Sequence, residues 1–248
     1  MDPCLEISPL HDWAISSTTD VPFYLDFVRV TTGDILEIGT GTGRIASLIA
    51  SVGKHVLAID TAPKQLRYAL QRWREDGGGA APLYLAADMR NLCIQHRFEL
   101  ILATHRSFER VLLDMERIRL FQDCASLLVS NGLLVVHVWS PPTEAIGGVR
   151  EKVEELPASD EHGPLRVIRR EERDPVRKIR RYTRRIEEKE GLKRTWDCPP
   201  MDLRWYTATD LESLGLRAGL RVDNRFSNFQ REAYSPGAAE LIWVYRKR

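Results

Sequence analysis

The sequence predicts an α/β fold in which helices cover both faces of a parallel sheet. Between residues 34 and 139, segments with the pattern of strands alternate with segments with the pattern of helices. The strand segments are continuously apolar, which is typical of strands buried on both faces of a sheet. A glycine-rich turn joins the first of these strands to the helix that follows it. The alternation and the apolar strands together indicate a layered α/β architecture.

The residues place each element of this pattern. Phe23, Phe27 and Val30 share one face at helical spacing, so a helix is expected over residues 19–30. The strands are expected at 34–39, 54–60, 83–88, 98–104 and 133–139. Further helices are expected at 41–53, 62–76 and 108–129, the last of them stopped by Asn131-Gly132.

A basic stretch interrupts this pattern after Pro141-Pro142. Residues 166–194 contain 13 Lys and Arg but only 6 Asp and Glu, so this stretch carries a charge of +7. Residues 178–188 and 192–198 are expected to form solvated antiparallel strands joined at Glu190-Gly191. Alternating apolar residues of this kind suit a sheet with one face in water.

The core pattern resumes at residue 203. Thr209 or Asp210 can cap a helix there, and two strands are expected to close the chain. Three parts follow from these boundaries. We expect residues 1–30 to form an N-terminal helical lid and residues 31–140 and 203–248 to form the core. Residues 141–202 are expected to form an inserted β-rich segment that shapes a substrate site or a dimer contact.

Composition narrows the class of protein. The chain has 248 residues, 43% of them hydrophobic, and a net charge of +1, which argues against disorder and weakly against a general nucleic-acid binder. It has no apolar run of membrane-spanning length and no secretory signal in MDPCLEISPL. Its four cysteines lack CxxC spacing, so we expect reduced thiols, no zinc site and a cytoplasmic location.

The first chemical motif is the glycine-rich turn of residues 37–43, at the end of the first strand. Glycines at this point let the backbone bend tightly and let a ligand approach closely. The dinucleotide fingerprint would need a small residue at position 44, where this chain has Arg44. Glu37 directly precedes the turn and would repel a pyrophosphate. It suits a cationic group instead, such as the ammonium of an amino acid.

Two further acidic residues follow the next strands. Asp60 ends the second strand, where a carboxylate can accept hydrogen bonds from ribose hydroxyls. Asp88 follows the third strand and can accept from an adenine amine, while Met89 can pack on the ring. Together with Glu37, these residues describe a site for a nucleoside that carries a cationic amino-acid tail.

On these residues the sequence resembles the class I S-adenosylmethionine-dependent methyltransferases, in particular the small-molecule type. The resemblance covers roughly residues 20–140 and 203–248, and includes LEIGTGTGRIA (36–46), LAIDTAPKQL (57–66) and AADMRNL (86–92). It implies a doubly wound, Rossmann-like sheet of seven strands, the last one antiparallel. It also implies S-adenosylmethionine as the cofactor, bound by Glu37, Gly39, Thr40, Gly41, Gly43, Asp60, Thr61, Asp88, Met89 and Thr104.

The family places the methyl acceptor near the end of the fourth strand, where this chain has His105 and Arg106. His105 could act as a general base, since the unperturbed pKa of histidine suits proton removal near neutrality, or it could only orient the acceptor. Arg106 could hold an anionic substrate group or form a surface ion pair. Trp13 and Tyr24 could contact the substrate as part of a lid, or simply pack the N-terminal helix.

The expected activity is methyl transfer from S-adenosylmethionine to N or O of a small molecule, without a metal. No [DNS]PP[YF] motif follows the fourth strand, and ATHR at its end offers no acidic pair for magnesium. Three alternatives remain: an RNA or protein methyltransferase that uses the basic stretch 166–194, a non-catalytic cofactor-binding protein, and a dehydrogenase. We expect no membrane contact, little nucleic-acid binding, and a monomer or homodimer.

Overall fold

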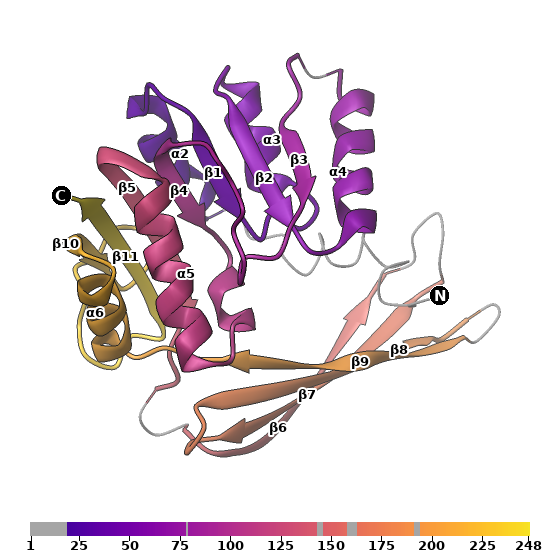
Figure 1. Cartoon of the computed structure of the whole chain (residues 1–248). Coiled ribbons are helices and arrows are strands. Elements are labelled where there is room, and N and C mark those ends of the chain that lie inside the picture. The colour runs from indigo at the N-terminus through magenta and orange to yellow at the C-terminus, as the bar shows by residue number, and fades with distance from the viewer. Residues whose placement is uncertain (1–18, 78, 143–145, 158–162, 191–193) are drawn as a thin grey trace.

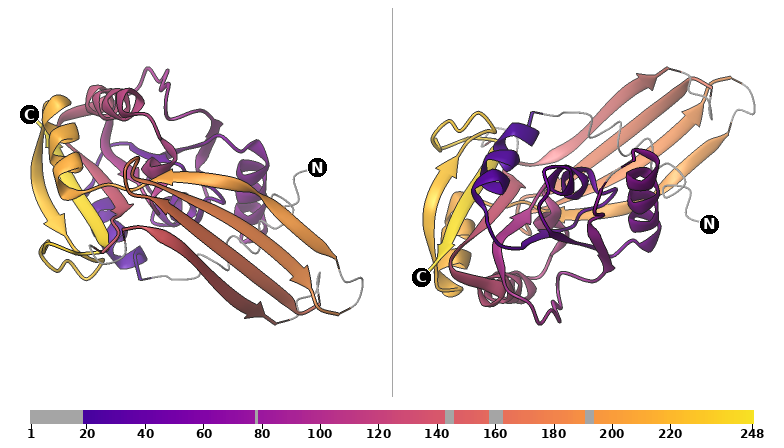
Figure 2. Two further views of the ribbon diagram at one scale, coloured as in Figure 1. Left: turned by 90° about the horizontal axis from the view of Figure 1, so that it is seen from below. Right: turned by 90° about the horizontal axis from the view of Figure 1, so that it is seen from above.

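The chain folds into two β-sheets and the helices that accompany them (Figure 1). The computed structural model describes residues 19–248, apart from residues 78, 143–145, 158–162 and 191–193. One sheet has seven strands and the other has four. Figures 1 and 2 show the smaller sheet extending below the carboxyl ends of the parallel strands of the larger one.

The seven-stranded sheet has the order β10-β11-β5-β4-β1-β2-β3. Neighbouring strands from β1 to β5 pair in parallel, and β11 runs antiparallel to both β5 and β10. The expected mostly parallel sheet with an antiparallel last strand is therefore confirmed. The strands are β1 Ile35–Ile38, β2 Val56–Asp60, β3 Leu83–Ala86, β4 Phe98–Ala103, β5 Leu128–Trp139, β10 Leu220–Phe226 and β11 Glu240–Lys247.

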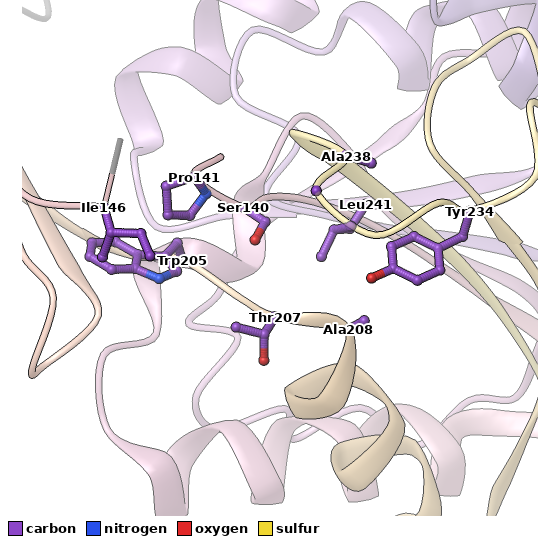
Figure 3. A pocket seen from close by; sticks show the side chains of 10 residues that line it. Ser140, Pro141, Ile146, Trp205, Thr207, Ala208, Tyr234, Ala238 and Leu241 are labelled. Atoms are coloured by element: carbon purple, nitrogen blue, oxygen red, sulfur yellow. The ribbon is translucent and has the colours of Figure 1, made fainter. Parts of the chain in front are cut away.

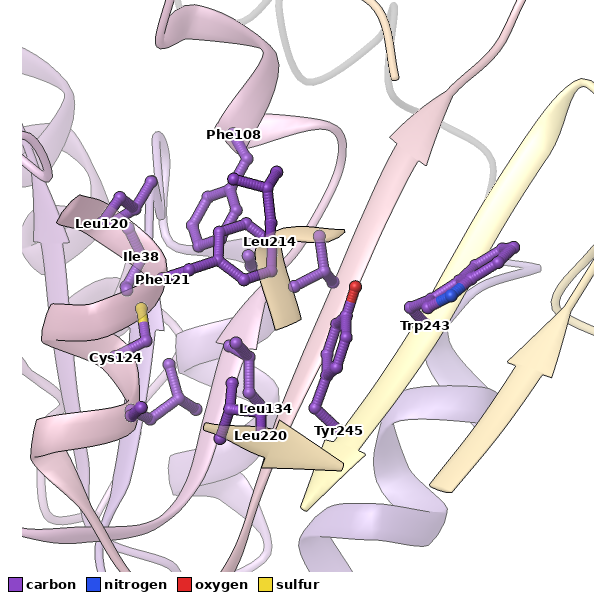
Figure 4. Packing of buried hydrophobic residues seen from close by; sticks show 14 of the residues in the cluster. Ile38, Phe108, Leu120, Phe121, Cys124, Leu134, Leu214, Leu220, Trp243 and Tyr245 are labelled. Carbon is purple, nitrogen blue, oxygen red and sulfur yellow. The ribbon is translucent and has the colours of Figure 1, made fainter. Parts of the chain in front are cut away.

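Helices cover this sheet on both faces and create two apolar clusters. One cluster joins the sheet to α5 and α6, with Phe121, Leu214 and Tyr245 fully or almost fully buried (Figure 4). The other joins it to α2 and α3, through Phe23 and Ile49 among others. The helices are α2 Val21–Val30, α3 Arg44–Ser51, α4 Pro63–Glu75, α5 Asp114–Leu127 and α6 Ala208–Arg217, with a 3-10 turn, η1, at Ser107–Arg110. None of the helices in the described residues is long and apolar enough to cross a membrane.

The single helix expected over residues 108–129 is wrong. The structure has η1 first and begins α5 only at Asp114, because the chain is extended at Val111 and Leu113. The helix then ends at Leu127 and passes directly into β5. Asn131 does adopt the left-handed conformation, with φ of 62°. It lies inside β5, where the pairing with β4 shifts register, so it forms a bulge and not a helix stop.

The four-stranded sheet is antiparallel throughout, in the order β6-β7-β8-β9. Its strands are β6 Gly148–Leu156, β7 Leu165–Asp174, β8 Ile179–Glu188 and β9 Thr195–Arg204. The two strands expected in this region correspond to β8 and β9, while β6 and β7 had not been placed. The sheet has only a small apolar cluster of its own, formed by Leu165, Val167 and Ile186. It therefore depends on contact with the larger sheet for stability.

A buried ion pair joins the two sheets. Arg180 of β8 pairs with Glu109 of η1, and both side chains are almost completely buried. The Arg180 guanidinium also lies 4.2 Å from the ring centroid of Trp139, at the end of β5. Glu109 in turn accepts a hydrogen bond of 2.6 Å from the backbone N–H of Trp139. The Glu109 carboxylate and the aromatic face of Trp139 thus compensate for the desolvation of the Arg180 charge.

A capping box starts α6, where the chain returns from the smaller sheet. Thr207 is the N-cap: its hydroxyl accepts from the backbone N–H of Asp210, and the Asp210 carboxylate accepts from the backbone N–H of Thr207. The sequence had suggested Thr209 or Asp210 as the cap. Asp210 also pairs with Lys178 of the smaller sheet at 2.9 Å, so this cap is part of the junction between the sheets.

Candidate active site

A cavity of about 860 Å³ opens at the carboxyl ends of β1, β2 and β4. This is the edge at which open α/β sheets bind ligands, and the volume falls within the range of about 300–1,000 Å³ typical of ligand sites. The opposite wall comes from β7, β8 and β9 of the smaller sheet. The expected site residues that line the cavity are Glu37, Gly39, Thr40, Gly41, Asp60, Thr61, Asp88, Met89, Thr104, His105 and Arg106.

The glycine-rich turn forms the floor of this cavity. Gly39 and Gly41 have φ of 78° and 58°, a backbone conformation that favours glycine. A Cβ on Gly39 would also lie 2.4 Å from Cβ of Ser107. Gly43 differs, because it does not line the cavity, and a Cβ there would meet the Tyr84 hydroxyl at 2.4 Å. The structure therefore gives Gly43 a packing role beneath the turn.

Glu37 is buried at the end of β1. Its carboxylate accepts hydrogen bonds from the hydroxyls of Thr40 at 2.7 Å and Thr104 at 2.9 Å. Burial raises the pKa of Glu37 to about 7, although both hydrogen bonds act in the opposite direction. Within the described part of the chain, no Lys or Arg forms a direct ion pair with it. A ligand cation placed here would therefore relieve the cost of burying this carboxylate.

An ion pair between Arg44 and Asp20 supports the glycine-rich turn, and it was not predicted from the sequence. Arg44, in the first turn of α3, forms a bidentate pair with Asp20 before α2, with distances of 2.8 and 2.5 Å. Arg44 lines the cavity and lies close enough to Glu37 to affect its pKa. The pair fixes the start of α2 against the glycine turn. The sequence feature that could have indicated this pair was Arg44 itself, which stands where a dinucleotide fingerprint needs a small residue.

Asp60 ends β2 and holds the turn from the other side. Its carboxylate accepts from the backbone N–H of Gly41 and from that of Ala62, each at 2.9 Å. A carboxylate has about four acceptor sites, so two bonds leave capacity for a ligand. Since Asp60 also lines the cavity, its geometry is compatible with contact to a ribose.

Asp88 and Met89 complete this half of the cavity. Asp88 forms a bidentate pair with the Arg90 guanidinium and accepts from the Arg90 backbone N–H at 2.9 Å. These bonds lower the pKa of the Asp88 carboxyl, so it is ionised at neutral pH. Arg90 competes with the expected adenine amine for the same oxygens. Met89 lies beside Gly39, where its side chain can pack against a flat ring.

His105 and Arg106 follow Thr104 in an unusual backbone conformation. Both have positive φ, 46° and 64°, which is costly for residues with a Cβ and is concentrated at functional sites. His105 is exposed to the cavity but surrounded by protein. Desolvation, with help from His137 and Arg106, lowers its pKa to about 4. His105 is therefore neutral at pH 7 and a weaker base than a free imidazole.

Glu240 holds this segment in place from β11. It pairs with Arg106 and accepts a hydrogen bond of 2.6 Å from Nε2 of His137. His137 is buried in β5 and hydrogen-bonded to Glu240, so its role is structural. Arg106 still lines the cavity, but its guanidinium is engaged by Glu240 instead of being available to a substrate. The Glu240 carboxylate thus helps to stabilise the strained backbone that carries His105.

The two lid residues have different outcomes. Trp13 lies outside the described residues. Tyr24 is completely buried between Phe23 and Phe229, with ring centroids 5.6 and 5.8 Å away, and does not line the cavity. The idea that Tyr24 contacts substrate is therefore wrong for this structure, because the ring is part of the core.

The expectation of reduced thiols also needs a correction. Cys198 of β9, which lines the cavity, is disulfide-bonded. Cys93 and Cys124 are free, as expected. Across the ranges that the structure describes, no group of three or more His, Cys, Asp or Glu side chains could hold a metal ion.

A second, smaller cavity of about 190 Å³ lies where β5, β9 and α6 meet (Figure 3). Its lining includes Ser140, Trp205, Thr207 and Tyr234, and none of the lining side chains is charged. It lacks the acids and bases of the large cavity. The large cavity is therefore the candidate active site.

The wall contributed by the smaller sheet was not anticipated. Arg180, Tyr182 and Arg184 of β8 face the cavity, as do Arg169 of β7 and residues 198–203 of β9. The only sequence signal for these residues was the basic composition of 166–194. Composition does not say which of several arginines on alternating faces points at a ligand.

Comparisons with known proteins match the part of the chain that carries these strand ends. Residues 35–132 match the family model described as a methyltransferase domain. No curated protein sequence matches the chain significantly.

Several solved structures share the fold. The CcbJ methyltransferase from Streptomyces caelestis has a TM-score of 0.82 and 19% identity, over 93% of this chain and 89% of that one. An S-adenosylmethionine-dependent methyltransferase from Clostridium acetobutylicum has a TM-score of 0.80 and 15% identity, over 98% of both chains. CalS10 from Micromonospora echinaspora, an amino pentose methyltransferase solved with bound S-adenosylmethionine, has a TM-score of 0.72 and 17% identity, over 96% of this chain and 97% of that one. The methyltransferase domain match over residues 35–132 and the fold shared with these structures agree with the resemblance described from the sequence.

Proposed function

We propose that this chain transfers a methyl group from S-adenosylmethionine to an N or O atom of a small molecule held between its two sheets. One observation carries the proposal: a single cavity joins the acidic strand ends of the larger sheet to a separate wall of the smaller sheet. One side suits a nucleoside with a cationic tail. The other side leaves room for an acceptor.

The residues present fit the cofactor. Glu37 is a buried carboxylate with a raised pKa and no direct cationic partner among the described side chains, so an amino-acid ammonium would stabilise its charged form. Asp60 has free acceptor capacity for ribose hydroxyls, and Met89 can pack on adenine. When bound, S-adenosylmethionine supplies a methyl group already activated by a sulfonium.

The protein then has to orient the acceptor, exclude water and accommodate one proton. Orientation can supply up to about 7–11 kcal/mol of a barrier, whereas a general base contributes about 10²–10⁴-fold. His105 is neutral at pH 7, so it can accept a hydrogen bond from an amine or hydroxyl of the acceptor and thereby orient the lone pair of that N or O atom. Because its pKa is low, orientation is its main contribution.

The related structures favour a small acceptor. The name of CalS10 describes an amino pentose methyltransferase, and its fold covers almost all of this chain, including the smaller sheet. A sugar-sized amine would fit in the cavity beside the cofactor. We infer that residues 141–202 form the acceptor wall and that the described start of the N-terminal segment supports the glycine turn.

The alternative of an RNA methyltransferase finds less support. Cations on the exposed face of the smaller sheet are neutralised by acids of the same sheet, as in the pairs Arg181–Asp202 and Arg185–Asp197. A surface that binds phosphates along a strand needs uncompensated positive charge. Binding of tRNA that weakens steeply with salt would favour the alternative.

A transfer assay tests the proposal. Purified protein is incubated with tritiated S-adenosylmethionine and cell extracts fractionated into small molecules, RNA and protein, and labelled products are identified by mass spectrometry. We expect label in a small molecule and lower yield with Asp60→Ala. Label only in RNA or protein, or none at all while the protein binds the cofactor, would contradict the proposal.

A further inference from the structure

We propose that the methyl acceptor carries an anionic oxygen group, a phosphate or a carboxylate, which binds between Arg110 and Arg184 in the large cavity. This inference rests on the proposed function and names the substrate class of the same site. It is carried by the ion pairing of the arginines that line the cavity.

Most of the arginines in the cavity already have a carboxylate partner. Seven arginines line the cavity. Five of them are engaged by a carboxylate: Arg44 by Asp20, Arg90 by Asp88, Arg106 by Glu240, Arg169 by Glu154 and Arg180 by Glu109. The side chains of Arg110 and Arg184 have no ion pair or hydrogen bond with any residue that the structure describes.

Arg184 is also exceptional within its own sheet. The structure describes 12 of the 13 Lys and Arg residues of 166–194. Every one except Arg184 forms an ion pair, and those that do are Arg166, Arg169, Arg170, Arg173, Arg177, Lys178, Arg180, Arg181, Arg185, Lys189 and Arg194. Among the described Lys and Arg residues of this basic stretch, the one without an ion pair therefore lines the cavity. Its neighbour Arg185 is exposed and paired with Asp197 at 2.7 Å.

Arg110 and Arg184 come from opposite walls but affect each other. Arg110 is the last residue of η1, which follows β4 of the larger sheet, and Arg184 lies in β8 of the smaller sheet. Desolvation lowers the pKa of Arg184, and the charges of Arg169 and Arg110 lower it further. Desolvation also lowers the pKa of Arg110, while Asp60 and Glu109 act on it in the opposite direction from beyond ion-pair distance. The Arg110 side chain is exposed at the cavity and that of Arg184 is half-buried. Neighbouring cations in such a partly enclosed site repel each other until an anion joins them.

The chemistry of guanidinium identifies the ligand class. Its planar set of donors matches the oxygens of a carboxylate or phosphate, and two such groups suit a dianion. The cofactor adds a positive sulfonium to the same cavity. An anionic acceptor would be attracted by all of these charges, whereas a cationic or neutral acceptor would leave both arginines unpaired.

Anion titrations test this inference with the full chain. Sodium pyrophosphate and sodium succinate are titrated by calorimetry at constant ionic strength into wild type, Arg184→Gln, Arg110→Gln and the control Arg185→Gln. We expect saturable binding of at least one anion by wild type and the control, weakened about tenfold or more in the two cavity variants. Pyrophosphate binding would identify a phosphorylated acceptor, and succinate binding a carboxylate.

Thermal unfolding separates this role from a structural one. Removing a desolvated, unpaired cation should leave the Tm of Arg184→Gln unchanged or raise it, and adding the bound anion should raise the Tm of wild type more than that of the variant. No saturable binding by wild type, or equal binding by Arg184→Gln and wild type, would overturn the inference. A parallel titration with S-adenosylhomocysteine tests the proposed function separately: its failure beside Arg184-dependent anion binding would refute the cofactor and leave the anion site.

Discussion

The two walls of the cavity are built in opposite ways. The wall from the larger sheet carries acids at successive strand ends, where neutral hydroxyls and backbone N–H groups of the strand-end loops donate hydrogen bonds to Glu37 and Asp60. The wall from the smaller sheet carries arginines, of which Arg180 pairs with Glu109 and Arg184 has no side-chain partner among the described residues. Neutral donors thus hold the side that suits the cofactor, whereas paired and unpaired cations form the side that we assign to the acceptor.

The two sheets also differ in what stabilises them. The larger sheet has large apolar clusters on both faces, whereas the described part of the smaller one has a small cluster of its own, formed by Leu165, Val167 and Ile186. The smaller sheet therefore depends on polar links to the core. Acceptor specificity can vary through this sheet without disturbing the site at the strand ends.

The largest expected effect comes from breaking the link between the sheets. Glu109→Ala leaves Arg180 buried without its partner, so we expect a loss of about 3–5 kcal/mol in the free energy of unfolding. Urea denaturation followed by circular dichroism measures it. The double variant Glu109→Gln, Arg180→Met should lose less, and a loss below about 1 kcal/mol in the single variant would show that the pair does not hold the sheets together.

A second test concerns the residue between the two walls. His105→Asn tolerates the positive φ at this position better than Ala would, so it removes the imidazole with little backbone strain. We expect kcat to fall by less than about 100-fold, the lower end of general-base effects, because the pKa of about 4 makes His105 a weak base. A loss above about 1,000-fold, with a pH profile that loses its acidic limb, would instead identify an essential base.

Glu37 gives the cofactor side a pH dependence. Its pKa rises from 4.5 to about 7 on folding, so its contribution to stability falls as pH rises between these values and changes little above. A bound ammonium favours the ionised carboxylate. Affinity for S-adenosylhomocysteine should therefore rise about tenfold from about pH 6 to about pH 8.

Calorimetry in buffers of different ionisation enthalpy measures both the affinity and the accompanying proton release. Glu37→Gln should bind more weakly at pH 8 and lose this pH dependence. An unchanged pH profile in that variant would assign the titration to another group.

The smallest effect is expected at the return from the smaller sheet. Thr207→Ala removes the N-cap of α6 and should cost about 1 kcal/mol in the free energy of unfolding. Thr207→Ser keeps the capping hydroxyl and serves as the control. Equal destabilisation by both variants would mean that the methyl group, not the hydroxyl, stabilises the junction.

Residues close together in the chain made much of the fold predictable. Glycines 39 and 41, followed by Asp60 and Asp88 at later strand ends, predicted the parallel sheet and one edge of the cavity, because strand ends of a parallel sheet meet there. The prediction that Asn131 stops a helix was wrong, because a residue in the left-handed conformation can form a β-bulge as well as end a helix.

Long-range contacts explain what the sequence could not reveal. The burial of Tyr24 depends on Phe229, which is distant in the chain. The low pKa of His105 comes first from desolvation and then from the charge of His137, which lies in another strand. The unpaired state of Arg184 becomes visible only when the partners of its neighbours are known. Such pairings across sheets leave no periodic signal in the chain.

The most direct test of the central claim is a calorimetric titration with S-adenosylhomocysteine. Wild type should bind one equivalent per chain. Asp60→Ala should bind about 100-fold more weakly, because it loses the carboxylate that holds the turn and faces the expected ribose. The exposed control Asp197→Ala, on the outer sheet, should bind like wild type. Equal affinity of wild type and Asp60→Ala would contradict a cofactor site at the carboxyl ends of β1 and β2.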